Sequence, residues 1–235
     1  MSPDFLTEGP QGNREKGNQV MSDGRLVLLL ALAGCCLAFS LARAESEGPL
    51  DRFSPEQRRK LLAGEAVYEY VNYEGREKEE KGLGHGQTYV IVNRPLEVCW
   101  SIMTDFDKKK EYYPRVVVSE VVKREENKAW VREVLDFRIA SIEYVMVQKM
   151  DRQKYRVDFY LDPAYPHDLK DSQGFWHWEK LDDKRSLLTY AVTTADVGLP
   201  VPEFIVKALS SRDLPGIAEN LKKRIESNGK WRKPS

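Results

Sequence analysis

The sequence predicts one α+β domain, in which antiparallel strands form a sheet and helices gather on one side of it. Two features predict this class: the apolar spacing changes from helical to alternating in long blocks, and short polar turns separate several alternating stretches. Short turns are typical of antiparallel neighbours. The composition is that of a globular protein, because 41% of the 235 residues are hydrophobic and 31% are charged.

The first elements are a short helix and two strands. Ser54 is a helix-capping residue, a proline follows it, and Gln57 completes a capping box, so we expect a helix over residues 55–62. Tyr and Val at alternating positions predict strands over residues 65–73 and 88–92, joined by a charged segment that contains glycines.

A second helical block begins at Pro95. Its apolar side chains recur at helical spacing, so we expect them to pack on the sheet. These side chains are Cys99, Ile102, Met103 and Phe106. A further short helical piece is expected over residues 110–113, before Pro114 ends it. The lysine run 108–110 is interpreted as solvated surface.

Alternating patterns return after Pro114 and predict a series of strands. These cover residues 116–123, 129–139, 143–150, 155–161, 174–181 and 187–195. Polar turns over residues 125–127, 151–153 and 182–185 join neighbours in this series, which favours antiparallel pairing.

The last element is expected to be a helix. Its apolar face consists of Phe204, Ala208, Leu214, Ile217, Leu221 and Ile225. The charged side chains expected on the opposite, solvated face are Lys222, Lys223, Arg224 and Glu226. Pro215 lacks an N–H group, so we expect the helix to be interrupted near residues 210–213.

The N-terminus has the pattern of an export signal. An uncharged apolar run over residues 26–41 follows Arg25 and precedes Ala42-Arg43-Ala44, a small-x-small cleavage site. The run is shorter than the roughly 20 apolar residues that span a bilayer comfortably. We therefore expect residues 1–44 to be a disordered N-terminus with a signal peptide, and the mature protein to be periplasmic or secreted.

Two questions about this segment stay open. Leu32-Ala33-Gly34-Cys35 resembles a bacterial lipobox, in which Cys35 would be acylated and would anchor the domain to a membrane. The start is Met1 or Met21, because Met21 opens a conventional n-region. Cleavage at the small-x-small site would leave Cys99 alone, without an intrachain disulfide.

The mature chain divides into a linker with a short helix (45–64), a folded domain (65–228) and a basic tail (229–235). Lys plus Arg and Asp plus Glu both number 37, so no net positive field points to nucleic acid as a partner. The basic C-terminus favours contact with an anionic membrane surface, and a solvated tail is the alternative. Its residues are Lys222, Lys223, Arg224, Lys230, Trp231, Arg232 and Lys233.

The helical block from Pro95 to Phe106, followed by Tyr113-Pro114 and a valine-rich strand, resembles the START-like (SRPBCC) superfamily. The similarity is greatest to its branch of polyketide cyclases, lipid-transport proteins and coenzyme-Q-binding proteins. The segments 174–176, 199–200 and 214–224 match as well, and the resemblance covers about residues 67–226. It implies the helix-grip fold, in which a curved antiparallel sheet wraps a C-terminal helix around a cavity for a sterol, lipid, quinone or polyketide.

Strand alternation predicts which side chains line that cavity. Along residues 155–161 the odd positions are apolar and the even positions mostly charged, so the odd ones are expected to point inward. Glu133 and Gln148 also point inward and would need a partner, such as a ligand head group, a water or, for Glu133, a rim arginine. The predicted lining is Glu133, Leu135, Phe137, Tyr144, Met146, Gln148, Tyr155, Val157, Phe159, Trp176, Trp178 and Phe204.

No catalytic or metal-binding motif is recognised. His85, His167 and His177 do not have zinc-site spacing, and we expect neither a metal nor a cofactor. Cys99 lies on an apolar stripe and is interpreted as a core residue. The leading hypothesis is a protein that binds or transports a hydrophobic small molecule. The alternatives are a cyclase-like or aromatase-like enzyme, with Glu133 or a Tyr as acid or base, and a protein-interaction module.

Overall fold

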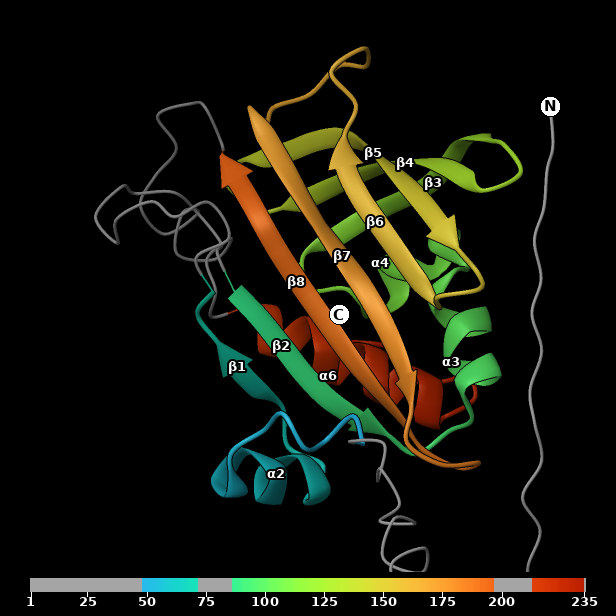
Figure 1. Ribbon diagram of the computed structural model, residues 1–235. Coiled ribbons are helices and arrows are strands. Elements are labelled where there is room, and N and C mark those ends of the chain that lie inside the picture. Colours follow the sequence, from blue (N-terminus) through green and yellow to red (C-terminus); the bar gives the residue numbers. More distant parts are fainter. Residues whose placement is uncertain (1–47, 72–85, 197–212, 235) are drawn as a thin grey trace, which may run out of the picture. The chain divides into compact units, whose positions relative to one another are not determined.

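The computed structural model describes residues 48–71, 86–196 and 213–234. Their strands form one curved antiparallel sheet in the order β1-β2-β8-β7-β6-β5-β4-β3 (Figure 1). The strands are β1 (Val67–Glu69), β2 (Gly86–Val92), β3 (Val116–Arg124), β4 (Lys128–Asp136), β5 (Ser141–Asp151), β6 (Arg156–Leu161), β7 (Asp171–Lys180) and β8 (Ser186–Asp196). The expected α+β, helix-grip class is confirmed.

Helices lie on both faces of this sheet. They are α2 (Pro55–Leu62), α3 (Leu96–Met103), the 3-10 turn η1 (Phe106–Lys108), α4 (Lys109–Tyr112) and α6 (Asp213–Glu226). Figure 1 shows α6 crossing behind β2 and β8. Val90 and Val92 of β2 join α6 and α3 in the main core, and we call their side of the sheet the inner face.

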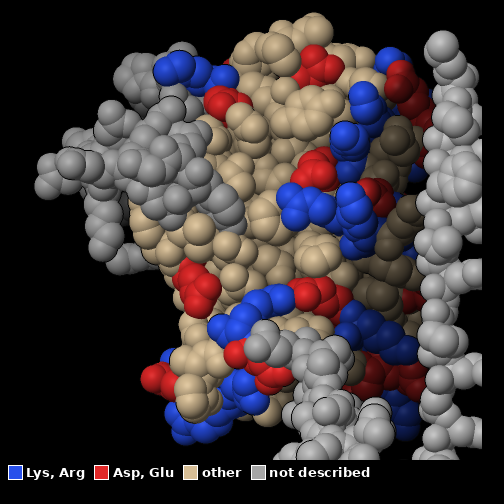
Figure 2. Space-filling model, in the orientation of Figure 1, with Lys and Arg blue, Asp and Glu red and all other residues tan. Residues whose placement is uncertain are grey.

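The outer face is covered in part by α2. Tyr89 and Ile91 alternate with the inner valines of β2 and pack with Phe53 and Leu61 in a second, smaller core. The capping box expected at Ser54 is present, and it fixes where α2 begins. Figure 2 shows basic and acidic side chains of the described residues lying close to one another on the outer side of the sheet.

The predicted strand over residues 129–139 is too long at its C-terminal end. β4 ends at Asp136, whose carboxylate accepts a 2.7 Å hydrogen bond from the Arg138 N–H, and Arg138 has a φ of 68°. Ile139, the last residue of the predicted strand, is 73% exposed at this turn. Local bonding by an aspartate therefore stops the strand where the alternation alone predicted that it would continue.

Pro215 does not break the described part of the last helix. It lies in the first turn of α6, where backbone N–H groups have no partner within the helix. The expected face residues Phe204 and Ala208 lie outside the described residues. No described helix is long and apolar enough to cross a membrane.

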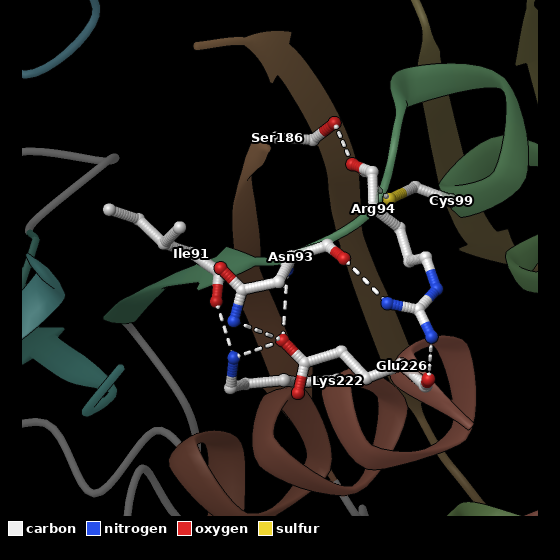
Figure 3. Close-up of polar contacts among 7 residues, drawn as sticks. All are labelled: Ile91, Asn93, Arg94, Cys99, Ser186, Lys222 and Glu226. Carbon is white, nitrogen blue, oxygen red and sulfur yellow. Dashed lines mark hydrogen bonds and ion pairs between the residues drawn. The ribbon is translucent and has the colours of Figure 1, made fainter. Parts of the chain in front are cut away.

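The C-terminal end of α6 is fastened to the loop between β2 and α3 (Figure 3). Glu226 Oε1 accepts hydrogen bonds of 2.9 Å from both nitrogens of Asn93, and Lys222 Nζ donates to the Ile91 carbonyl at 2.8 Å. Arg94 donates to the Glu226 main-chain carbonyl. Burial disfavours the charged form of Glu226, but the hydrogen bonds from Lys222 and Asn93 outweigh it and lower the pKa of its carboxyl.

The apolar stripe of the second helical block is confirmed in part. Cys99 and Met103 are buried, and Phe106 is 1% exposed although it lies in η1. Ile102 is only partly buried, and Trp100 is buried in its place. Of the lysine run, Lys108 and Lys110 are exposed as expected, but Lys109 is only 5% exposed.

We expect Phe106→Ala to lower the free energy of unfolding by about 3 to 5 kcal/mol, because it removes a ring from the main core. Lys110 is exposed, and Lys110→Ala should change stability by no more than about 0.5 kcal/mol. Urea unfolding followed by tryptophan fluorescence measures both. Small and equal effects would place Phe106 outside the core.

Candidate ligand-binding site

The structure buries most of the predicted lining residues on the inner face. Those in the main core are Leu135, Phe137, Tyr144, Met146, Val157, Phe159, Trp176 and Trp178. Glu133 and Gln148 are buried polar residues, at 3% and 1% exposed. Phe204 lies outside the described residues. That these side chains contact a ligand stays a prediction.

Tyr155 occupies a different position from the one predicted. It precedes β6, has a φ of 49° and is only partly buried. Its ring packs edge-on against Trp100 of α3, with centroids 5.8 Å apart, and its hydroxyl donates to Glu97. The left-handed backbone ends the alternation before Arg156, and Tyr155 packs against the main core beside α3 while it is only partly buried.

An aromatic group lies where β6, β7 and β8 meet on the inner face. The rings of Trp176 and Tyr190 stack with centroids 3.9 Å apart. Phe159 lies beside Tyr190 and over Gly174, where an added Cβ would be 2.3 Å from the Phe159 ring and 2.2 Å from the Ala191 carbonyl oxygen. Glycine at 174 is therefore required for this ring to lie flat on the sheet.

A buried ion pair joins α4 to the sheet. Lys109 Nζ is 2.7 Å from Glu133 Oε1, and both side chains are almost fully buried. Tyr144, opposite Glu133 on β5, donates to Glu133 Oε2 at 3.1 Å. The partner of Glu133 is thus a lysine from a helix and not the rim arginine considered above. Each charge is compensated, which a carboxylate in this position requires.

A second pair of polar groups comes from tyrosines. The hydroxyls of Tyr113, directly after α4, and Tyr190 are 2.9 Å apart. Burial, with smaller contributions from nearby acidic groups, raises the pKa values of Tyr113, Tyr144 and Tyr190. These hydroxyls therefore remain protonated at neutral pH and can donate hydrogen bonds.

Two buried side-chain atoms on the inner face have no hydrogen-bond partner among the described residues. They are Gln148 Oε1 on β5 and Thr88 Oγ1 on β2. Most buried polar groups in proteins have a partner, so such atoms call for an explanation such as a water or a ligand.

Three inner-face residues were not predicted from the sequence, namely Lys109, Tyr113 and Tyr190. Tyr190 alternates with the buried Leu188 and Val192, so strand alternation could have found it. Lys109 and Tyr113 follow Phe106 at spacings of three and seven, which continues the helical stripe. The positive charge of Lys109 hid this signal.

The basic C-terminus is not a free tail, since several of its cations bind the protein itself. Arg224, expected on the solvated face, is buried with its guanidinium 2.6 Å from Glu111 of α4. Lys233 Nζ donates to the carbonyls of Tyr113 and Val116 at 2.8 and 2.6 Å. Contact with a membrane stays a prediction, for which Lys223, Lys230 and Arg232 remain exposed.

The described residues offer little to nucleophilic or metal chemistry. Burial raises the pKa of the Cys99 thiol to about 12, so it is not a thiolate at neutral pH. No group of potential ligand side chains within the described residues could hold a metal ion. His167 is exposed, His177 lies on the outer face, and His85 lies outside the described residues.

We expect Lys109→Ala to lower the free energy of unfolding by about 3 to 5 kcal/mol, because Glu133 would keep a buried charge without a partner. Replacing both residues, as Lys109→Met with Glu133→Leu, should recover most of this loss, since no buried charge remains. Urea melts of Lys109→Met, Glu133→Leu and the double variant form a double-mutant cycle. Strictly additive effects would show that the pair is not coupled.

Comparison with known proteins supports the same fold. A family model described as polyketide cyclase / dehydrase and lipid transport matches residues 92–222. The protein TTHA0849 from Thermus thermophilus is 20% identical, with 60% of this chain and 96% of that chain covered and a TM-score of 0.51. Human STARD10 is 15% identical, with 72% and 77% covered and a TM-score of 0.52.

Human StAR-related lipid transfer protein 5 covers more of the chain. It is 13% identical, with 86% of this chain and 96% of that chain covered and a TM-score of 0.52. No curated protein matches the sequence. The solved structures share the fold, and the family match spans more than half of the chain. The protein therefore belongs to the polyketide cyclase/dehydrase and lipid-transport family.

Proposed function

We propose that this protein binds and carries a hydrophobic small molecule between the inner face of the sheet and α6. Membership of a family that includes lipid-transport proteins supports this class of function. The ligand would be of lipid, quinone or sterol type, as the resemblance implies. Its apolar part would contact the aromatic and aliphatic side chains of β5, β6 and β7.

The observation that carries the proposal is the set of polar groups buried among these apolar side chains. A purely structural core gains little from an ion pair, two tyrosine hydroxyls and an amide whose oxygen lacks a partner among the described residues. Binding sites for small molecules combine an apolar lining with a few polar groups that orient the ligand. The inner face has this composition.

An enzyme of the cyclase type is the second candidate, and the Glu133–Tyr144 hydrogen bond favours it. A carboxylate next to a protonated tyrosine can act as a general acid–base pair. However, the Glu133 carboxylate is already bound by Lys109 and would have to leave this ion pair to accept a proton from a substrate. Binding of a ligand does not require Glu133 to leave its ion pair with Lys109, so we prefer the binding function.

We also propose that the domain is exported. The support is the apolar run 26–41 after Arg25, together with the small-x-small site at Ala42-Arg43-Ala44. Lipidation at Cys35 would place the same domain at a membrane instead of free in solution. All these residues lie outside the described part of the chain.

Titration with a panel of fluorescent lipids, sterols and quinones tests the binding function. A ligand on the inner face should change the emission of Trp176 or Trp178, which are 3% and 2% exposed, and should raise Tm. Met146→Trp should weaken binding by narrowing the space, whereas the exposed Lys149→Ala should not. If no compound in the panel changes emission or Tm, the inner face is a closed core and the proposal is wrong.

Export is tested by N-terminal sequencing of protein purified from its own host. Cleavage at the small-x-small site should give a chain that begins at Glu45, and lipidation should give a blocked Cys35. An intact Met1 or Met21 on protein from the cytoplasm would contradict export.

A further inference from the structure

The side-chain amide of Gln148 is a buried polar group with an unmet hydrogen-bonding requirement. The residue is 1% exposed on β5, and its Oε1 atom has no donor within reach among the described residues. A carbonyl oxygen removed from water loses its hydrogen bonds unless a new donor replaces them. The site of Gln148 therefore calls for a hydrogen-bond donor.

The strand neighbours of Gln148 cannot supply that donor. Its register partners are Ala129 on β4 and Phe159 on β6, and neither side chain has a polar hydrogen. Met146 and Met150 share its face of β5, and a thioether sulfur is only a weak acceptor. Ala129 is the smallest of these neighbours.

The buried cations limit which ligand head group could carry the donor. Among the described residues, the buried cations are Lys109 and Arg224. Each already lies close to a carboxylate, at 2.7 Å from Glu133 and 2.6 Å from Glu111. A bound carboxylate or phosphate would therefore find no uncompensated cation among these buried groups, and its desolvation would be unfavourable.

We infer that the ligand is an uncharged lipid alcohol whose hydroxyl donates a hydrogen bond to Gln148 Oε1. This inference rests on the proposed binding function. A ketone or quinone oxygen only accepts hydrogen bonds and would leave Oε1 without a donor, whereas a hydroxyl both donates and accepts. The amide thus selects a class of head group, while the apolar side chains around it accommodate the chain or ring system.

Three probes with the same alkyl chain separate the head-group classes. These are 1-dodecanol, dodecyl methyl ether and dodecanoate, each measured by displacement of a bound fluorescent lipid. Wild-type protein should bind the alcohol about tenfold more tightly than the ether, which is the order expected for one hydrogen bond to a buried acceptor. Dodecanoate should bind more weakly than the alcohol.

Gln148→Leu removes the acceptor and introduces an apolar side chain of similar size. It should reduce the preference for alcohol over ether to about one, and its Tm should equal or exceed that of wild type because no unpaired buried group remains at this position. Gln153→Leu, in the exposed turn between β5 and β6, is the matched control and should keep the wild-type preference.

The outcomes distinguish this inference from the binding function. If no probe and no fluorescent lipid binds wild-type protein, the binding function itself fails. If the probes bind but the alcohol has no advantage over the ether, or if dodecanoate binds best, the inference is wrong. An advantage that survives in Gln148→Leu would assign the hydroxyl to another residue and would also overturn it.

Discussion

The ion pair between Lys109 and Glu133 fixes how the short helices lie on the sheet. Lysine and glutamate each lose several kcal/mol of hydration when buried, so they are stable inside only as a bonded pair. Here they are 2.7 Å apart, and Tyr144 adds a further hydrogen bond to the carboxylate. α4 spans Lys109–Tyr112 and is too short to persist by its own backbone bonds, so tertiary contacts of this kind determine its position.

Contacts with the C-terminal segment also hold α4 in place on its opposite side. Glu111 points away from the inner face and binds Arg224 of α6, while Lys233 binds the carbonyl that follows α4. Since Lys109 and Tyr113 are four residues apart, they lie on one side of the helix and both reach inner-face partners. The C-terminal segment is therefore part of the scaffold that places these polar groups, which explains why its cations are not all free.

The fold could be predicted from the sequence because two periodicities were clear: alternation in the strands, and a helical stripe from Cys99 to Phe106. Alternation also correctly predicted that the side chains of Glu133 and Gln148 are buried on the inner face of the sheet. It failed where a single residue changed the backbone, as at Arg138 and Tyr155, whose positive φ values end the strand pattern. Lys109 was missed for another reason: it continues the helical stripe, but a lysine is expected to be buried only if it has a charged partner, and that partner, Glu133, is 24 residues away.

The inner face differs from an ordinary core in how its polar groups are satisfied. Lys109 and Glu133 compensate each other, and the Tyr113 and Tyr190 hydroxyls are hydrogen-bonded to each other. Gln148 is different, because its oxygen lies among methyl, thioether and aromatic groups and has no donor within the described residues. An apolar residue of the same size would fill this position without that cost, so stability alone does not account for a glutamine there. A need for a hydrogen bond to something outside the chain does account for it.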